Sequence, residues 1–169
     1  RGTSLPAHSL YVKELCKEHG IVCEIYSENV ELIAKNRKQS TEEAGRDIRR
    51  ACFQKTLEEV NANKIALAHH KNDNAETLIM NLARGTGLKG MGGIRPVQGV
   101  YIRPLLCVSR MEIESYICEQ NLTYCCDVTN ESDDYTRNRI RNNVIPYLER
   151  EVNSAVVEHM GDTMEQLQQ

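Results

Sequence analysis

Two histidines and two carboxylates gather between His69 and Thr77, where an apolar strand is expected to meet an amphipathic helix. Asp73 and Glu76 are spaced so that both carboxylates lie on one face of that helix. In open α/β sheets, ligands bind at the carboxyl ends of strands, beside helix N-termini whose free N–H groups favour anions. Most such turns need only one capping residue. The surplus of ionisable groups therefore makes this junction a candidate functional site.

The same residues also allow a purely structural interpretation. Asp73 could be the N-cap of the helix, with Glu76 completing a capping box. The pair His69 and His70 could be a satisfied structural element at the end of a strand. The local pattern alone leaves both interpretations open.

The surrounding pattern predicts helices alternating with strands. Strands are expected at residues 21–26, 65–68 and 100–102. Helices are expected over residues 4–19, from residue 72 onward, from Ser109 to about Gln120 and over 152–167. A further helix is expected to begin at the capping signature Ser40-Thr41-Glu42-Glu43 and to reach an inward-facing Val60. A helix over 139–149 is expected to be interrupted at Pro146. This alternation predicts an α/β fold in which a Rossmann-like parallel sheet carries flanking helices.

Composition narrows the class of protein. With 169 residues, 40% of them hydrophobic and 27% charged, one domain with a real core is expected. No apolar run approaches membrane-spanning length, and no signal-peptide pattern occurs. The seven cysteines form no C-x-x-C pair, which favours a reduced, cytoplasmic protein over a disulfide scaffold.

Positive charge is concentrated locally although the net charge is −3. From Arg84 through Met111 there is no Asp or Glu, and six of the ten glycines fall in this stretch. A second basic cluster covers residues 137–141. Such patches can bind a polyanion, because its field acts over roughly a Debye length of ~8 Å. For a lone patch, a solvated charged face is the simpler interpretation.

An ordered set of motifs carries a family resemblance over nearly the whole chain. In chain order the motifs are Ser40-Thr41-Glu42-Glu43-Ala44 with Arg46 and Arg49, His69-His70 through Asp73-Asn74-Ala75-Glu76-Thr77, Arg84-Gly85-Thr86-Gly87-Leu88, Arg103-Pro104-Leu105-Leu106, Arg110 with Glu112, Asp127-Val128-Thr129-Asn130, and Arg137-Asn138-Arg139-Ile140-Arg141 before Pro146. With these motifs the sequence resembles the tRNA(Ile)-lysidine synthetase family of the N-type ATP pyrophosphatase, or PP-loop, superfamily. The resemblance implies an adenine nucleotide alpha hydrolase-like fold.

The chemistry that the resemblance implies is a two-step ligation. Such enzymes adenylate O2 of the wobble cytidine of tRNA(Ile) with a CAU anticodon, using ATP with Mg²⁺ and releasing pyrophosphate. The side-chain amine of free L-lysine then displaces AMP at C2 and leaves lysidine. The implied partners are this tRNA, L-lysine and ATP in the cytoplasm, without a membrane, and a homodimer is compatible with the resemblance.

The resemblance also implies roles for individual residues. Lysine binding falls to the carboxylates of Asp73 and Glu76, and no residue is assigned to a metal. The candidate catalytic residues are Asp73, His70, Arg46 and Arg84. The candidate ATP-binding residues are His70, Arg46, Arg84 and Gly85. Contacts to tRNA fall to Arg49, Arg137, Asn138, Arg139 and Arg141.

The chain departs from the family pattern in three respects. Asn72 stands where the family often has a second Asp, and Asn74 stands where Gln is usual. The Ser-Gly-Gly-x-Asp-Ser pyrophosphate loop does not occur in the sequence. We expect that loop and the first strand to lie upstream of Arg1, and an isolated 1–169 fragment not to turn over ATP. Residues 1–150 are then part of the catalytic domain, and residues 151–169 a helical linker toward C-terminal domains.

Two other functions stay open. A tRNA cytidine-thiolating PP-loop enzyme would share the nucleotide fold, but its chemistry favours C-x-x-C pairs. A non-catalytic RNA-binding homologue is favoured if the pyrophosphate loop is missing from the gene as well.

Overall fold

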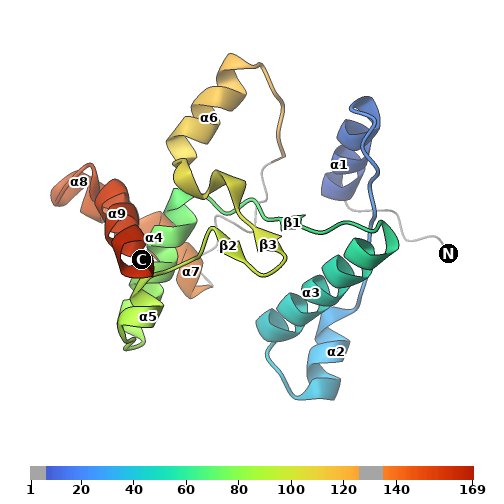
Figure 1. The fold of residues 1–169 in the computed structure, drawn as a ribbon, viewed down its shortest axis with the longest axis horizontal. Helices are drawn as coiled ribbons and strands as arrows, with labels where there is room; N and C mark the ends of the chain where they lie inside the picture. The colour runs from blue at the N-terminus through green and yellow to red at the C-terminus, as the bar shows by residue number, and fades with distance from the viewer. Residues whose placement is uncertain (1–6, 126–134) are drawn as a thin grey trace. The chain divides into compact units, whose positions relative to one another are not determined.

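The structure is a computed structural model that describes residues 7–125 and 135–169 (Figure 1). The expected helix cap at Ser4 and the motif at residues 127–130 lie outside the described residues. The chain divides into two compact units, Arg1–Asn63 and Lys64–Gln169, and each is described by itself. The elements form an α/β structure that is rich in helices and has a small sheet.

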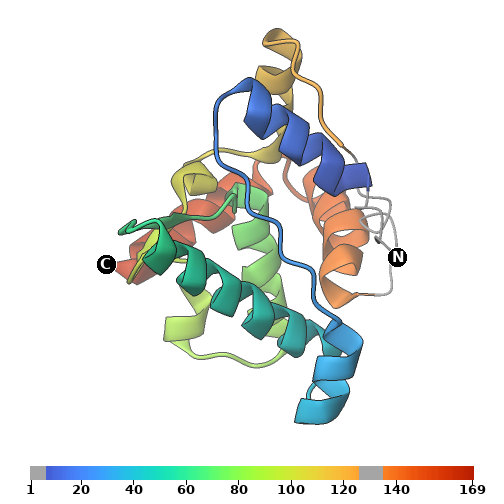
Figure 2. The same ribbon diagram turned by 90° about the vertical axis from the view of Figure 1, so that its right-hand side faces the viewer.

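The first unit consists of helices. They are α1 (Ala7–Glu18), α2 (Val30–Arg37) and α3 (Thr41–Glu59), and α2 and α3 lie side by side in both views (Figures 1 and 2). The predicted cap of α3 is confirmed, since the Ser40 side chain accepts a hydrogen bond from the Glu43 N–H at 3.2 Å. Val60 lies beyond the helix end and is 58% exposed, so its predicted inward position is wrong.

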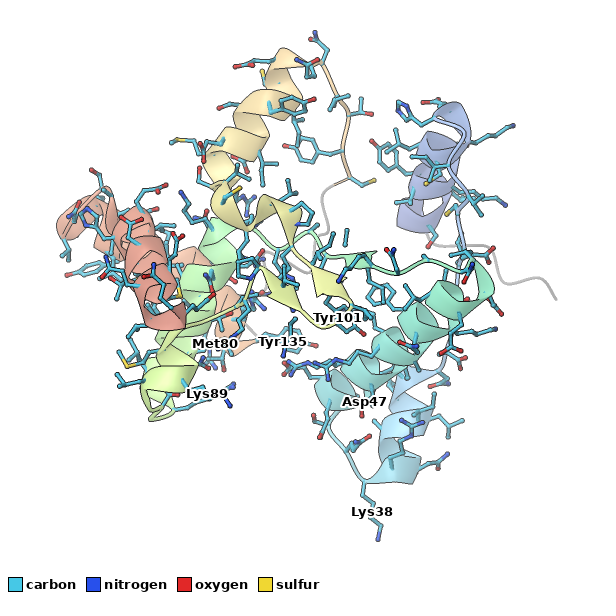
Figure 3. The ribbon with its side chains drawn as sticks, in the orientation of Figure 1. Lys38, Asp47, Met80, Lys89, Tyr101 and Tyr135 are labelled. Carbon is cyan, nitrogen blue, oxygen red and sulfur yellow. The ribbon has the colours of Figure 1, made fainter. Side chains whose placement is uncertain are left out.

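Helix α2 was not predicted from the sequence. It is eight residues long, and its N-cap is Asn29, whose Oδ1 accepts a hydrogen bond from the Leu32 N–H at 3.0 Å. Its C-cap is Lys38, which adopts the left-handed conformation (φ 52°), and the Lys38 side chain extends away from the helix (Figure 3). Caps at both ends stabilise a helix too short to show clear periodicity.

The predicted strand at residues 21–26 is wrong. The chain is not helical there, but no described segment pairs with it, and a strand requires a hydrogen-bonded neighbour. Ile21 and Val22 are accordingly 60% and 80% exposed. The end of the segment is held on α3 instead, because the Tyr26 hydroxyl lies 3.0 Å from Thr56 Oγ1 and Lys55 lies over the Tyr26 ring.

The sheet of the second unit is mixed rather than fully parallel. It contains β1 (Ile65–Ala66), β2 (Val97–Gln98) and β3 (Tyr101–Ile102) in the order β1-β3-β2. β1 and β3 are parallel, as predicted, with Ile65 opposite Tyr101. β2 is antiparallel to β3 and was not predicted. The two-residue turn at Gly99 (φ 62°) joins β2 to β3 directly, and such a short connection permits only an antiparallel pair.

Helix α4 (Lys71–Ala83) leaves the end of β1, and short elements follow it. These are α5 (Leu88–Met91), the 3₁₀ helix η1 (Pro104–Cys107) and α6 (Arg110–Glu119). The predicted capping box of α6 is confirmed, because Ser109 Oγ accepts from the Glu112 N–H and Glu112 accepts from the Ser109 N–H. Asn72 Oδ1 adds a cap from α4, accepting from the Arg110 N–H at 2.9 Å.

The helical segment after residue 135 is continuous. It comprises α7 (Thr136–Arg139), a π-helical turn η3 (Ile140–Val144) and α8 (Ile145–Glu151). The predicted interruption at Pro146 is therefore wrong. Pro146 is the second residue of α8, and the wider π turn directly before it accommodates the proline within the continuous helical segment.

Helix α9 (Val156–Gln168) packs against α4 and α5 within the second unit (Figure 1). It begins four residues later than predicted, because α8 extends to Glu151 and a turn follows. Val157 joins Ala75, Ile140 and Ile145 in one buried cluster, and Met164 is fully buried. In this structure the C-terminal helix is thus part of the core that supports α4.

Candidate functional site

Two carboxylates of α4 and two guanidinium groups form one hydrogen-bonded cluster. Arg137 Nε donates to Glu76 Oε2 at 2.6 Å, and Arg141 Nε donates to Glu76 Oε1 at 2.6 Å. Asp73 Oδ1 accepts from both arginines, at 3.1 Å from Arg137 Nη2 and 3.3 Å from Arg141 Nη2. We call Asp73, Glu76, Arg137 and Arg141 the charge cluster.

Local structure explains how the charge cluster is assembled. Asp73 is the third residue of α4, and its Oδ2 accepts a hydrogen bond from the backbone N–H of the N-cap, His70, at 3.0 Å. Glu76 lies almost one turn further along, on the same face. Ala75 is fully buried between α4 and the helical segment of Ile140. The small alanine lets the two backbones approach, so that the arginines reach both carboxylates.

The charge cluster is partly desolvated and balanced in charge. The Glu76 side chain is 1% exposed and the Asp73 side chain 13%, whereas Arg137 and Arg141 are 36% and 24% exposed. The hydrogen bond to Glu76 is the main reason why the pKa of Arg141 is raised above its usual value. Burial of charges at this depth is tolerated because each carboxylate accepts several charge-assisted hydrogen bonds.

A second group of polar side chains lies at the carboxyl ends of β1 and β3. His69 and His70 follow β1, and Arg103 follows β3. His70 Nε2 lies 3.3 Å from Asp73 Oδ2. Burial lowers the pKa of His69, and the nearby charges of Arg103 and Arg137 lower it further, against the opposing effect of Asp73. We call His69, His70 and Arg103 the strand-end group.

The structure brings together five of the residues that the resemblance singled out: His70, Asp73, Glu76, Arg137 and Arg141. The structure also shows that the purely structural interpretation of this junction, in which Asp73 is the N-cap and Glu76 completes a capping box, is wrong. Asp73 is not the N-cap of α4, since His70 has that position, and Glu76 takes no part in capping but binds two arginines.

The other predicted site residues are not members of the charge cluster. Arg84 and Gly85 follow the C-terminal end of α4, about 20 Å along the helix from His70. Arg139 is exposed and donates to Thr136 Oγ1 at 3.1 Å, while Asn138 is half-buried in α7. In the first unit, Arg46 pairs with Glu42 and Arg49 is exposed on α3.

Three supporting residues were assigned no role from the sequence. Asn72 caps α6, and Asn74 Oδ1 accepts a hydrogen bond from the Ile94 N–H at 2.6 Å, which fixes the backbone directly after Gly93 on α4. Arg103 Nη1 donates to the Arg95 carbonyl at 2.6 Å. For Asn72 and Asn74 the signal was their departure from the family pattern that the resemblance implies, since amides suit such bridging hydrogen bonds. For Arg103 the signal was its place in the motif Arg103-Pro104-Leu105-Leu106.

Some features of candidate sites do not occur in the described part of the chain. Within residues 7–125 and 135–169, no group of three or more His, Cys, Asp or Glu side chains could hold a metal ion. None of the described helices is both long and apolar enough to cross a membrane. The described cysteines carry free thiols: Cys16, Cys23, Cys52, Cys107, Cys118 and Cys125.

Comparison with known proteins identifies the family. The family model described as the PP-loop domain matches residues 5–148, and the chain therefore belongs to the PP-loop domain family. Similar curated proteins carry the name tRNA(Ile)-lysidine synthase. The protein of Caldanaerobacter subterraneus subsp. tengcongensis is 45% identical over 161 residues, which cover 95% of this chain and 34% of the relative.

Two further relatives have the same name. The Bacteroides thetaiotaomicron protein is 40% identical over 167 residues, covering 99% of this chain and 39% of the relative. The Parabacteroides distasonis protein is 47% identical over 134 residues, covering 79% of this chain and 30% of the relative. The chain thus spans about a third of the length of these curated relatives.

The lowered pKa of His69 predicts a loss of stability in mild acid. As the pH falls below the ordinary value of 6.5, the unfolded chain binds a proton at this residue before the folded chain does, so the free energy of unfolding falls. We expect chemical denaturation at pH 7.5 and pH 5.5 to show a smaller loss for His69→Gln than for the wild type. His19→Gln, which removes an exposed imidazole, is the comparison variant. An equal loss in His69→Gln and the wild type would contradict this prediction.

Proposed function

We propose that the protein containing this chain is an ATP-dependent tRNA-modifying ligase that converts the wobble cytidine of tRNA(Ile) to lysidine. The names of the similar curated proteins support this proposal, as does membership of the PP-loop domain family. The proposed reaction has two steps. O2 of the cytidine attacks the α-phosphorus of ATP and releases pyrophosphate, and the ε-amine of L-lysine then attacks C2 and releases AMP.

The single observation that carries the proposal is the pairing of opposite charges in the charge cluster. Free lysine presents two ammonium groups and one carboxylate, so its site needs both carboxylates and cations. Asp73 and Glu76 supply the carboxylates, and the partly exposed Arg137 and Arg141 supply the cations. We propose that lysine binds here, exchanging some of the internal hydrogen bonds for bonds to its own charged groups.

The remaining roles are part of the same proposal. The parallel pair β1 and β3, joined through α4, supports a Rossmann-like nucleotide-binding fold in which ATP lies near His70 at the strand ends. Mg²⁺ would come with the phosphates of ATP, because Mg²⁺ prefers substrate phosphates and water to protein cages. The exposed Arg139 and Arg49 are proposed phosphate contacts for a tRNA with a CAU anticodon. We further propose a cytoplasmic enzyme that acts as a homodimer.

Asp73→Asn tests the proposed lysine site. The change removes one negative charge and weakens a charge-assisted hydrogen bond worth roughly 1.5–3 kcal/mol. We expect the KM for lysine to rise about ten- to a hundred-fold. Formation of the adenylated tRNA should persist, because lysine does not take part in that step.

The control for this experiment is Glu114→Gln, which removes a carboxylate from an exposed ion pair on α6. Its KM for lysine should equal that of the wild type. The melting temperature of each variant separates a lost ligand contact from a general loss of stability. A wild-type dependence on lysine in Asp73→Asn would contradict the proposed site.

A further inference from the structure

A lysine is the first residue of the helix that carries both carboxylates of the charge cluster. Lys71 follows the N-cap His70 and precedes Asp73 by two residues in α4. A positive charge in the first turn of a helix is unfavourable, because the free N–H groups there already carry partial positive charge. The Lys71 side chain is nevertheless only 18% exposed, so water does not fully solvate this charge. Its position therefore calls for a specific explanation.

The explanation lies on α9. Lys71 Nζ donates to Glu158 Oε2 at 2.5 Å, across 87 residues of sequence. Glu158 lies in the first turn of α9, where a negative charge is favoured. The ion pair thus joins the N-terminal ends of two packed helices, and the carboxylate of Glu158 offsets the unfavourable charge of Lys71 at the start of α4.

The aliphatic part of the Lys71 side chain lies against α9 at Gly161. A Cβ added to Gly161 would be 3.7 Å from Lys71 Cγ and 3.8 Å from Lys71 Cδ. Gly161 follows Glu158 by three residues, so both residues lie on the same face of α9. The methylene groups of Lys71 therefore pack on the helix while its ammonium group reaches the carboxylate.

The backbone at the start of α4 is fixed as well. The Lys71 N–H donates to the Val108 carbonyl at 2.9 Å. Further along the two helices, Val157 of α9 and Ala75 of α4 belong to one buried cluster. Asp73 lies between Lys71 and Ala75 in the chain, so contacts with α9 hold α4 on both sides of this carboxylate.

We propose that Glu158 of α9 positions the first turn of α4 through Lys71, and thereby holds the Asp73 carboxylate where it binds lysine. This inference rests on the proposed function, in which Asp73 is a ligand of lysine. Lys71 and Glu158 are positioning residues, since they act on lysine through Asp73. Residues 151–169 then support the lysine site in addition to their predicted role as a linker.

The KM for lysine of the complete protein tests this inference. Glu158→Gln removes the charge of the carboxylate and keeps the size of the side chain. We expect it to raise the KM for lysine about three- to tenfold, with kcat unchanged, because it disturbs the placement of a binding group. Lys71→Met should have a similar effect. The double variant should have the same KM as either single variant, because each change already breaks the same ion pair.

Hydrogen exchange of the substrate-free protein gives a second readout that does not depend on activity. The Lys71 and Asn74 N–H groups donate to the carbonyls of Val108 and His70. In Glu158→Gln we expect both amides to exchange about three- to tenfold faster than in the wild type. The amides of α3 should exchange at the wild-type rate.

Two variants serve as controls for both measurements. Lys71→Arg keeps a cation that can pair with Glu158, so it should have nearly the wild-type KM and exchange rates. Glu165→Gln removes an exposed carboxylate from the same helix and should change neither quantity.

The outcomes separate the alternatives. A wild-type KM together with wild-type exchange in Glu158→Gln would overturn the inference. Independent effects of Glu158→Gln and Lys71→Met, multiplying in the double variant, would also overturn it. Faster exchange at the start of α4 in a protein that forms no lysidine would support the positioning of α4 by α9 while contradicting the proposed function.

Discussion

We expect Glu76→Gln to lower the free energy of unfolding by about 3–5 kcal/mol, which is the usual cost of removing one partner from a buried ion pair. The Glu76 side chain is 1% exposed and binds both Arg137 and Arg141 at 2.6 Å. Its loss of charge leaves two partly buried guanidinium groups to share the single carboxylate of Asp73. Chemical denaturation of the purified variant measures the effect.

The matched control is again Glu114→Gln. Glu114 also accepts a short hydrogen bond from an arginine, Arg110, at 2.7 Å, but both side chains are more than half exposed. Exposed pairs of this kind contribute less than about 1 kcal/mol, so the control should change little. If the two variants were equally stable, the charge cluster would contribute nothing beyond an ordinary surface ion pair.

The second large effect is expected for Gly93→Ala. Gly93 has φ 63°, and a Cβ added there would lie 2.5 Å from the Sδ of the fully buried Met164 and closer still to Asn74 Oδ1. Alanine would therefore bring backbone strain of about 1–2 kcal/mol. Displacing the two neighbours adds a further cost of about 1–3 kcal/mol. We expect denaturation experiments to show a total loss of about 3 kcal/mol.

Gly99→Ala separates these two contributions. Gly99 has nearly the same φ, 62°, but no atom lies within 4 Å of the added Cβ. This variant should lose only the backbone strain of about 1–2 kcal/mol. Equal losses at both positions would mean that displacing Asn74 and Met164 at position 93 does not affect stability.

Local features of the fold could be predicted because local chemistry controls them. The caps at Ser40 and Ser109 depend on side chains that bond to backbone N–H groups three residues away, and such spacing is visible in one sequence. An apolar run predicted a strand at residues 65–68, and the structure has a shorter strand at Ile65–Ala66, followed by the predicted helix. The resemblance likewise depends on short motifs, and membership of the PP-loop domain family confirms its superfamily.

Features that depend on distant neighbours could not be predicted in this way. Residues 21–26 have the composition of a strand, yet among the described residues nothing pairs with them. Pro146 was expected to interrupt a helix, but the π turn at residues 140–144 accommodates it. Periodicity describes one segment at a time, whereas pairing and helix distortion depend on what packs against the segment.

The sequence by itself determined which charged residues this protein has, the strand-to-helix junction that carries them and the family to which the chain belongs. Only the tertiary structure decided how those charges pair. Arg137 and Glu76 are 61 residues apart, and their hydrogen bond exists because α7 packs across the first turns of α4. The same packing turns Arg141 inward and leaves Arg139 exposed, although both belong to one basic cluster. Coulomb attraction acts through space, so its partners are fixed by the packing of helices that are distant in the chain.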